Sequence, residues 1–511
     1  MSTQFSIGII DIGSNSIRLV IYEINSHGAY RVVSEHKESA RLSERIGPDG
    51  CLHNKDILSV VPILSHYSRL CKAHQVKTVR AVATAAIRNA ANSAEVVRTL
   101  EEQTALRIEV LSGTEEARYG FLGVMNSIDI QDGFIIDIGG GSTEVTLFRG
   151  RSVAESFSFP FGAVNTTRQF MRSGTLAELE VAGIRRMVEE ALVSQPWIRK
   201  SPNLPMIGLG GGIRTLGKMS QKKNKYSLPL AHNYVLKAGE IDYFVGLLPS
   251  LTLEKRKKID GLSKDRADII IPGLIILDTI MKAANCSSFI TSGAGLRDGL
   301  LHETLDPQQP MKTDVLEASI ENLLMLHPNG AVAHVRHVDK LAMMLYDALI
   351  IDPAQQPRSK RYLHAAAKLY RIGASVHYYQ YARHTQYMIT QAHIDGFSHR
   401  EIVICSLIAC FKTKSRTHAQ ALVYKDILAE SDENMIMKLG LLLQLAIALD
   451  SSETQPVQDV EVSLSGKTLT LKLHCSHNPA HELKMIELIT KDFEKGSGLK
   501  LKVQAVAFSR T

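Results

Sequence analysis

The sequence predicts an α/β protein of several domains. At 511 residues the chain is too long for one hydrophobic core, so we expect roughly three or four domains. A strand–glycine turn–strand unit occurs at residues 7–22 and again at 134–148, which predicts two related α/β domains. A Pro/Gln-rich linker near residue 305 precedes a helical region, and strands around one helix return after residue 457. The expected domains are 1–126, 127–306, 307–452 and 453–511.

The two glycine turns are copies of one motif. Residues 9–13 (IIDIG) align with residues 135–139 (IIDIG) at a constant offset of 126, and Ser16 falls on Ser142. Each copy predicts a buried strand, a tight turn and a returning strand. The glycines permit positive φ angles, and the turn's amides and hydroxyls can donate to a phosphate. An ordinary hairpin tip would not repeat in this way, so we expect two facing domains that hold a phosphate between two loops.

The other elements of the first half alternate between strands and helices. Strands are expected at 31–37, 78–84, 107–111, 153–159 and 288–291, and helices at 56–74, 93–102, 176–193 and up to about residues 124 and 284. Residues 206–216 (MIGLGGGIRTL) form a third strand–glycine–helix unit, whose glycines precede a helix start that suits a phosphate. Residues 292–299 are a fourth glycine turn that enters a helix.

Several charged residues near these turns are candidates for chemistry. Asp137 and Glu144 flank the second turn, where they could hold a divalent cation or a water. Arg88 follows a strand end and is either a bidentate phosphate ligand or a plain surface arginine. Glu115 and Glu116 begin a helix, where they either stabilise the helix dipole or include a general base.

The charge, cysteine content and hydrophobicity of the chain restrict the kinds of partner and the cellular location that we expect. The net charge of +7 and the pI of about 8.9 favour a polyanionic partner. The six cysteines are scattered without metal-binding spacing, which is typical of reduced thiols in a cytosolic protein. No basic leader precedes the first strand, and the longest apolar run, residues 441–449, is too short for a membrane span.

The helical region contains several histidines without the pattern of a metal site. A histidine–aspartate phosphohydrolase would need a His-Asp pair where this chain has Tyr370-Arg371. We therefore interpret these histidines as core or surface residues: His334, His337, His364, His377, His384 and His393.

Four motifs occur together in one order. They are DIGSNS at 11–16, SGTEEAR at 112–118, DIGGGSTE at 137–144 and GLGGGIR at 208–214. This combination closely resembles the exopolyphosphatase/guanosine pentaphosphate phosphohydrolase family, which belongs to the superfamily of actin, sugar kinases and Hsp70 chaperones. The resemblance implies two ribonuclease H-like (actin-like) domains over roughly the first 300 residues. It further implies an all-α histidine–aspartate-like domain without metal ligands and a small C-terminal α+β module.

The same resemblance implies roles for individual residues. Glu116 matches the carboxylate that activates the attacking water, and Glu144 is the second catalytic candidate. Asp137 and the matching Asp11 are the expected ligands of Mg²⁺ or another divalent cation. Arg266 and Asp268 are further candidates for the site, and their match to the family is weaker than that of the other residues. The phosphate-binding candidates are Gly13, Ser14, Asn15, Ser16, Arg88, Gly139, Gly140, Gly141, Ser142, Gly210, Gly211 and Gly212.

The function expected from these residues is that of an exopolyphosphatase. Such an enzyme hydrolyses terminal phosphates of inorganic polyphosphate to orthophosphate by metal-assisted attack of water. The nearest alternative is a 5′-phosphohydrolase of pppGpp, which the same motifs would serve. An actin-like kinase or ATPase and a non-catalytic polyphosphate sensor are more distant alternatives. We expect a cytoplasmic homodimer that neither binds DNA nor spans a membrane.

Overall fold

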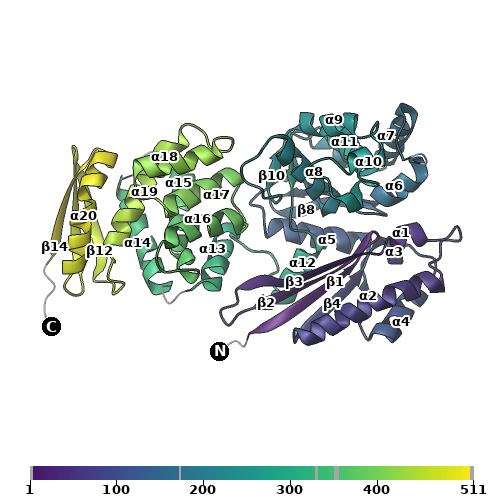
Figure 1. Cartoon of the computed structure of the whole chain (residues 1–511), viewed down its shortest axis with the longest axis horizontal. Helices are drawn as coiled ribbons and strands as arrows, with labels where there is room; N and C mark the ends of the chain where they lie inside the picture. The colour runs from purple at the N-terminus through teal and green to yellow at the C-terminus, as the bar shows by residue number, and fades with distance from the viewer. Residues whose placement is uncertain (1–3, 172–173, 329–331, 350–355, 507–511) are drawn as a thin grey trace. The chain divides into compact units, whose positions relative to one another are not determined.

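The computed structural model describes residues 4–171, 174–328, 332–349 and 356–506 and divides into two compact units, residues 1–315 and 316–511 (Figure 1). The first unit contains two α/β lobes, and the second contains a helical domain with a small sheet. This arrangement confirms the predicted fold class. The exact domain boundaries stay predictions.

The first lobe is built on a five-stranded sheet with the order β3-β2-β1-β4-β5. β1 pairs antiparallel with β2 and parallel with β4. The side chains of β1 belong to two hydrophobic cores. Ile10 and Ile12 pack with α2 and α4, whereas Ile7 and Ile9 pack in the other core of this lobe. The elements are β1 (Phe5–Ile12), β2 (Ser16–Ile24), β3 (Tyr30–Ser39), α1 (Leu42–Arg45), α2 (Asn54–Ala73), β4 (Thr78–Ala83), α3 (Ala85–Arg88), α4 (Ser93–Thr104) and β5 (Ile108–Val110).

The second lobe is built on a six-stranded sheet with the order β10-β11-β9-β6-β7-β8. Its largest core joins the sheet to α7, α8 and the strongly apolar α11. The elements are β6 (Gly133–Ile138), β7 (Thr143–Arg149), β8 (Ser152–Phe159), α6 (Ala163–Phe170), α7 (Glu178–Leu192), η1 (Pro196–Lys200), β9 (Pro205–Leu209), α8 (Gly210–Lys223), β10 (Tyr234–Leu236), α9 (Ala238–Leu247), α10 (Leu253–Arg256), η2 (Lys264–Arg266), α11 (Ile270–Ala283) and β11 (Ser288–Thr291). The sequence patterns did not predict α6 or β10.

Two helices join the lobes. α5 (Gly113–Met125) buries Tyr119 and Leu122 against the first sheet and Val124 against the second, so it is apolar on more than one face. α12 (Leu296–Leu305) packs on α5 so closely that a Cβ on Gly299 would lie 2.0 Å from a carbonyl oxygen of α5. Figure 1 shows both helices between the two sheets.

The predicted repeat is confirmed as a pair of matching hairpins. Asp11 pairs with Arg18 across β1–β2, and Asp137 pairs with Glu144 across β6–β7. In each turn the first glycine donates its amide to the carbonyl of the serine three residues later, at 3.2 Å in the first turn and 2.9 Å in the second. The two turns therefore share their register as well as their sequence.

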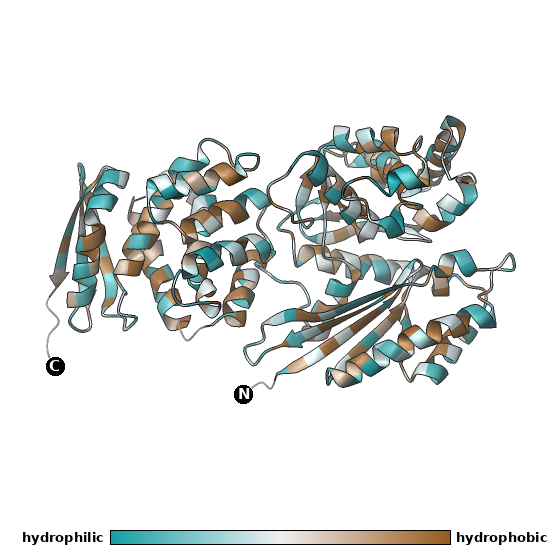
Figure 2. Ribbon diagram, viewed as in Figure 1, coloured by the Kyte–Doolittle hydropathy of each residue, from teal (hydrophilic) through white to brown (hydrophobic). Residues whose placement is uncertain are grey.

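The second unit contains the expected helical region and the β-α-β module. A three-stranded sheet, β12-β13-β14, packs with α20, and Gly466 adopts a positive φ of 59° in the predicted turn. Hydrophobic and hydrophilic residues alternate along its helices (Figure 2). The elements are α13 (Val315–Leu326), α14 (Val332–Leu349), α15 (Gln356–Leu369), η3 (Ile372–Ser375), α16 (Tyr381–Gln391), α17 (His399–Ala409), α18 (Lys414–Ala421), η4 (Leu422–Tyr424), α19 (Asp432–Ala448), β12 (Val457–Ser465), β13 (Thr468–Cys475), α20 (Ala480–Ser497) and β14 (Lys500–Val506).

His334 lies in a buried hydrogen-bonded cluster of this helical domain. Its Nδ1 is 2.8 Å from an oxygen of Asp450, and its Nε2 is hydrogen-bonded to the Tyr370 hydroxyl. All three side chains are buried and satisfy one another. No helix in the described part of the chain is long and apolar enough to cross a membrane.

Candidate active site

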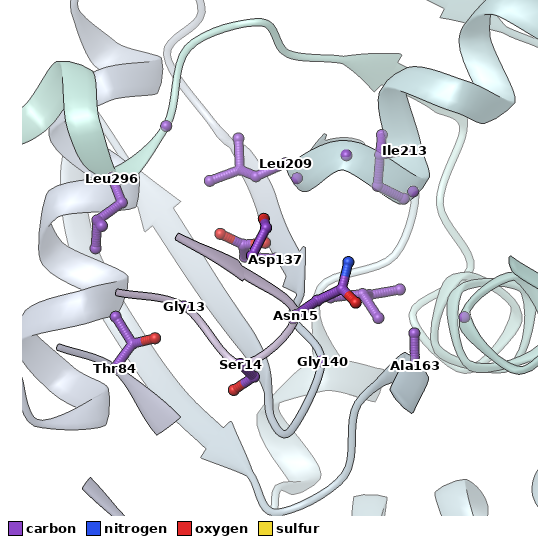
Figure 3. A pocket seen from close by; sticks show the side chains of 18 of the residues that line it. Gly13, Ser14, Asn15, Thr84, Asp137, Gly140, Ala163, Leu209, Ile213 and Leu296 are labelled. Carbon is purple, nitrogen blue, oxygen red and sulfur yellow. The ribbon is translucent and has the colours of Figure 1, made fainter. Parts of the chain in front are cut away.

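A cavity of about 170 Å³ lies where the two hairpin turns meet the starts of α8 and α12. Figure 3 shows Asp137 and the Gly13–Asn15 turn at this cavity, with Leu209 and Ile213 on another wall. Most of the candidates from the sequence line it: Asp11, Gly13, Ser14, Asn15, Ser16, Glu116, Asp137, Gly139, Gly140, Ser142, Gly210, Gly211 and Gly212. The cavity wall does not include Arg88, Gly141 or Glu144, although each lies next to it.

The two turns contact each other through glycines. A Cβ on Gly140 would lie 2.9 Å from the Ser14 Cβ, and one on Gly141 would lie 3.3 Å from the Ser14 Oγ. A larger residue at either position would push the turns apart. Gly141 therefore supports the close approach of the turns, and its neighbours line the cavity.

Two adjacent carboxylates at the start of α5, those of Glu115 and Glu116, make different contacts. Glu115 completes a capping box: its Oε2 accepts the Ser112 amide at 2.8 Å, and the Ser112 Oγ accepts the Glu115 amide at 3.2 Å. Glu116, the next residue, faces the cavity. Burial, together with the charge of Glu144, raises the pKa of Glu116 well above its usual value, which makes its carboxylate a stronger base.

Arg88 holds the Glu116 carboxylate in position. Its Nη1 donates to the Glu116 Oε2 at 2.7 Å and to the Leu111 carbonyl at 2.9 Å. The sequence suggested a strand end, but Arg88 is the last residue of the four-residue helix α3. That turn of helix brings the guanidinium to Glu116, so Arg88 contacts the candidate base directly.

Glu144 and Asp137 form the acidic floor behind the second turn. Glu144 is 3% exposed; its Oε1 accepts the Ser158 hydroxyl at 2.7 Å, and no group in the described part of the chain donates a hydrogen bond to its buried Oε2. Burial raises the pKa of Glu144. Burial and the charge of Glu144 raise the pKa of Asp137 to about 7, although the charge of Arg214 opposes this shift. The raised pKa values of Asp137 and Glu144 show that nearby positive charges do not fully compensate the two carboxylates.

The acidic groups fit a divalent cation that keeps part of its water shell. Burial also raises the pKa of Asp11, so Asp11 and Asp137 both gain from a nearby positive charge. No group of three His, Cys, Asp or Glu residues in the described ranges is arranged to hold a metal. Mg²⁺ usually takes one or two protein carboxylates plus water and substrate phosphates, so this sparse oxygen set suits it.

Four arginines in the cavity wall complete the site, and sequence reasoning largely missed them. They come from four elements: β2, α8, η2 and α12. Burial and the charges of other arginines lower the pKa of Arg214 to about 10. Such crowding indicates a site built for an anion with several charges. The four residues are Arg18, Arg214, Arg266 and Arg297.

The sequence held one signal for two of these arginines. Arg214 follows the glycines of the third turn after a single apolar residue, and Arg297 follows the fourth turn in the same way. In both cases the glycine turn enters a helix, α8 or α12, which carries the arginine in its first turns. A repeated glycine–apolar–arginine pattern therefore marks this part of the site.

Comparison with known proteins identifies the family of this chain. The sequence profile of the Ppx/GppA phosphatase family matches residues 20–308, and that of Ppx/GppA phosphatase domain III matches residues 315–495. The chain belongs to the Ppx/GppA phosphatase family. This family member is 25% identical over 308 residues to exopolyphosphatase 1 of Mycobacterium bovis and of Mycobacterium tuberculosis, a match that covers 59% of this chain and 89% of each relative.

Solved structures show the same fold over 60% of the chain. The Aquifex aeolicus member of the Ppx/GppA family is 30% identical, with a TM-score of 0.52 over 60% of this chain and 99% of that chain. An exopolyphosphatase from Cytophaga hutchinsonii is 22% identical, with a TM-score of 0.56 over 60% of this chain and 100% of that chain. The expected actin-like domain pair is thus confirmed. As a Ppx/GppA phosphatase, the protein is an enzyme of the hydrolase class.

Proposed function

We propose that this Ppx/GppA family member is an exopolyphosphatase, which releases orthophosphate from the ends of inorganic polyphosphate. The observation that carries the proposal is the cavity itself, because its lining presents a partly buried candidate base and four arginines. A terminal phosphoryl group and the phosphates behind it carry the matching negative charges. A cytosolic location and a homodimeric assembly belong to the same proposal.

The arginines and the two turns would bind and orient the end of the chain. Arginine pairs with phosphate oxygens through charge-assisted, often bidentate, hydrogen bonds. The crowded guanidiniums repel one another, so a phosphate placed among them relieves an existing repulsion. The turn amides and the Ser14 and Ser142 side chains lie at the same cavity and can donate to phosphate oxygens.

Glu116 would prepare the attacking water. Arg88 occupies its Oε2, which leaves Oε1 to accept a proton from the water. The water oxygen forms the new bond to the terminal phosphorus while the anhydride bond on the opposite side breaks. The shortened chain leaves with the bonding electrons as a phosphate oxyanion, whose charge the arginines stabilise.

Asp11 and Asp137 would hold the divalent cation in this scheme. When bound, the cation would neutralise phosphate charge and relieve the repulsion among the buried carboxylates. Glu144 lies behind Asp137 with its Oε1 fixed by Ser158. Its unpaired Oε2 suits a hydrogen bond from a water held near the cation.

Phosphate release from long-chain polyphosphate, pppGpp and ATP, each with and without Mg²⁺, tests the proposal. We expect the highest kcat/KM with polyphosphate and near-complete dependence on the cation. A strong preference for pppGpp would replace the proposal with a nucleotide 5′-phosphohydrolase. Transfer of phosphate from ATP to an acceptor would indicate a kinase, and binding of polyphosphate without release would indicate a sensor.

A further inference from the structure

Charged residues in the segment around η2 contact two different parts of the protein, the cavity and the first lobe. Arg266 lines the cavity, and its guanidinium lies over Gly211, where a Cβ would be 2.1 Å from the Arg266 Nη2. The aspartates on either side reach across to the first lobe instead. Asp265 forms an ion pair with Lys37, and the Asp268 Oδ2 is 2.8 Å from the Arg41 Nη2. One short segment therefore carries a cavity arginine and two bridges between the lobes.

The first-lobe end of the bridge is attached to the phosphate-binding turn. Arg41 adopts a left-handed backbone conformation with φ 48°, which is uncommon for a residue with a side chain. Its amide donates to the Asn15 carbonyl at 3.0 Å, and the Ser43 amide donates to the Ser14 carbonyl at 3.1 Å. These two hydrogen bonds couple the position of Arg41 to that of the turn that faces the cavity.

The second-lobe end is anchored by a buried arginine. Arg256 is fully buried, and its Nη1 donates to the Ala267 carbonyl at 2.7 Å. Ala267 stands between Arg266 and Asp268 in the chain. Because their shared neighbour is fixed to the body of the lobe, Arg266 and Asp268 move with the lobe as one piece.

We infer that the ion pairs Arg41–Asp268 and Lys37–Asp265 form a latch between the two lobes, which holds Arg266 over the cavity and opens to admit the phosphate chain. The inference rests on the proposed function for the identity of the substrate. The four latch side chains are each between 29% and 42% exposed, so water and salt weaken their attraction. Each pair then shifts the closed-to-open ratio by only about two- to five-fold.

Modest strength is what a latch needs if it opens at every turnover. Arg18 and Arg266 both line the cavity and repel each other, and this repulsion opposes closure. A phosphate between them reverses the repulsion, so substrate and latch favour the closed state together. The latch therefore lowers the free energy of the closed state relative to the open state even without substrate.

The test compares Asp268→Asn, Asp265→Asn and their combination with the matched control Asp260→Asn. Asp260 is exposed on the same lobe and makes no hydrogen bond or ion pair within the described residues. Tripolyphosphate hydrolysis supplies KM and kcat. Hydrogen–deuterium exchange of residues 13–16 and 210–212 reports closure without any turnover, with pyrophosphate as the ligand.

We expect KM to rise about two- to five-fold for each single variant and up to about ten-fold for the pair, with kcat unchanged or raised. Exchange in both loops should become faster, and about 0.5 M salt should move the wild type toward the variants. The charge-swapped protein Arg41→Asp/Asp268→Arg should recover most of the loss. Unchanged KM and exchange, or a swap that recovers nothing, would overturn the latch.

The two proposals fail in different ways. If the wild-type protein releases phosphate from no substrate, the proposed function is wrong, but the exchange experiment with pyrophosphate still decides the latch. If phosphate is released and the loops exchange identically in all variants, the latch is wrong and the proposed function stands.

Discussion

The substitution Glu116→Gln removes the candidate base with little change in shape. The new amide is close in size to the carboxylate, and its oxygen can still accept the hydrogen bond that Arg88 donates at 2.7 Å in the wild type. We therefore expect the variant to fold and its melting temperature to stay within a few degrees. Loss of a general base typically costs about 10²–10⁴-fold in rate, which is about 3 to 5 kcal/mol of transition-state stabilisation. The kcat for polyphosphate should fall by that factor while KM changes little.

The neighbouring residue provides the control. Glu115→Gln keeps an acceptor in the capping box of α5 and lies on the same helix turn. It should lose only about 0.3–1 kcal/mol of stability from the helix dipole and retain nearly full turnover. A pair of variants one residue apart thus separates the local effect of a lost carboxylate from a catalytic one.

The pH profile sharpens the same test. Burial raises the pKa of Glu116, and a base must be ionised to accept a proton. Wild-type turnover should therefore rise with pH through that raised pKa, and Glu116→Gln should lack this limb. A variant that keeps kcat within about three-fold of the wild type, with the limb intact, would refute the assignment. Glu144→Gln would then be the next variant to measure.

Three further outcomes are expected. Gly211→Ala should displace the flexible Arg266 guanidinium, which would lie 2.1 Å from the new Cβ, and raise KM about 10- to 100-fold with little change in thermal stability. Ser158→Ala should lower kcat about ten-fold, because the lost hydrogen bond both fixes the Glu144 Oε1 and holds down the pKa of Glu144; Ser158→Thr should restore much of the rate. Asp137, whose pKa is raised from 3.8 to about 7, keeps its proton in the folded protein where the unfolded chain has lost it, so stability without metal should fall as pH rises from about 4 to 7. Calorimetric melts at about pH 5 and about pH 8 should show stabilisation by Mg²⁺ mainly at the higher pH.

The hairpins were accessible to sequence reasoning because their information is local. The alternation of apolar residues and the glycines of each turn predict a strand, a turn and a strand, and the repeat of Asp11 at Asp137 predicts a common register. Neighbouring residues along the chain supply all of these interactions. For the same reason the sequence located the helix start at residues 112–118 and the hairpin at 457–475.

The choice between Glu115 and Glu116 needed the structure. Both are first-turn carboxylates with the same local environment in the sequence. Ser112 captures one of them, and the direction of the helix turns the other toward Arg88, which lies on a different element. Which carboxylate serves as the base candidate therefore depends on how α5 packs between two sheets.

By itself the sequence determined the family, the repeated glycine turns and the residue types at the candidate site, since motifs are runs of adjacent residues. Only the tertiary structure decided that four arginines from four elements meet in one cavity, that Arg88 binds Glu116, and that Asp268 bridges to Arg41. Single arginines at scattered positions carry no local signal. Their meaning comes from long-range packing, which brings like charges together where an anion can stabilise them.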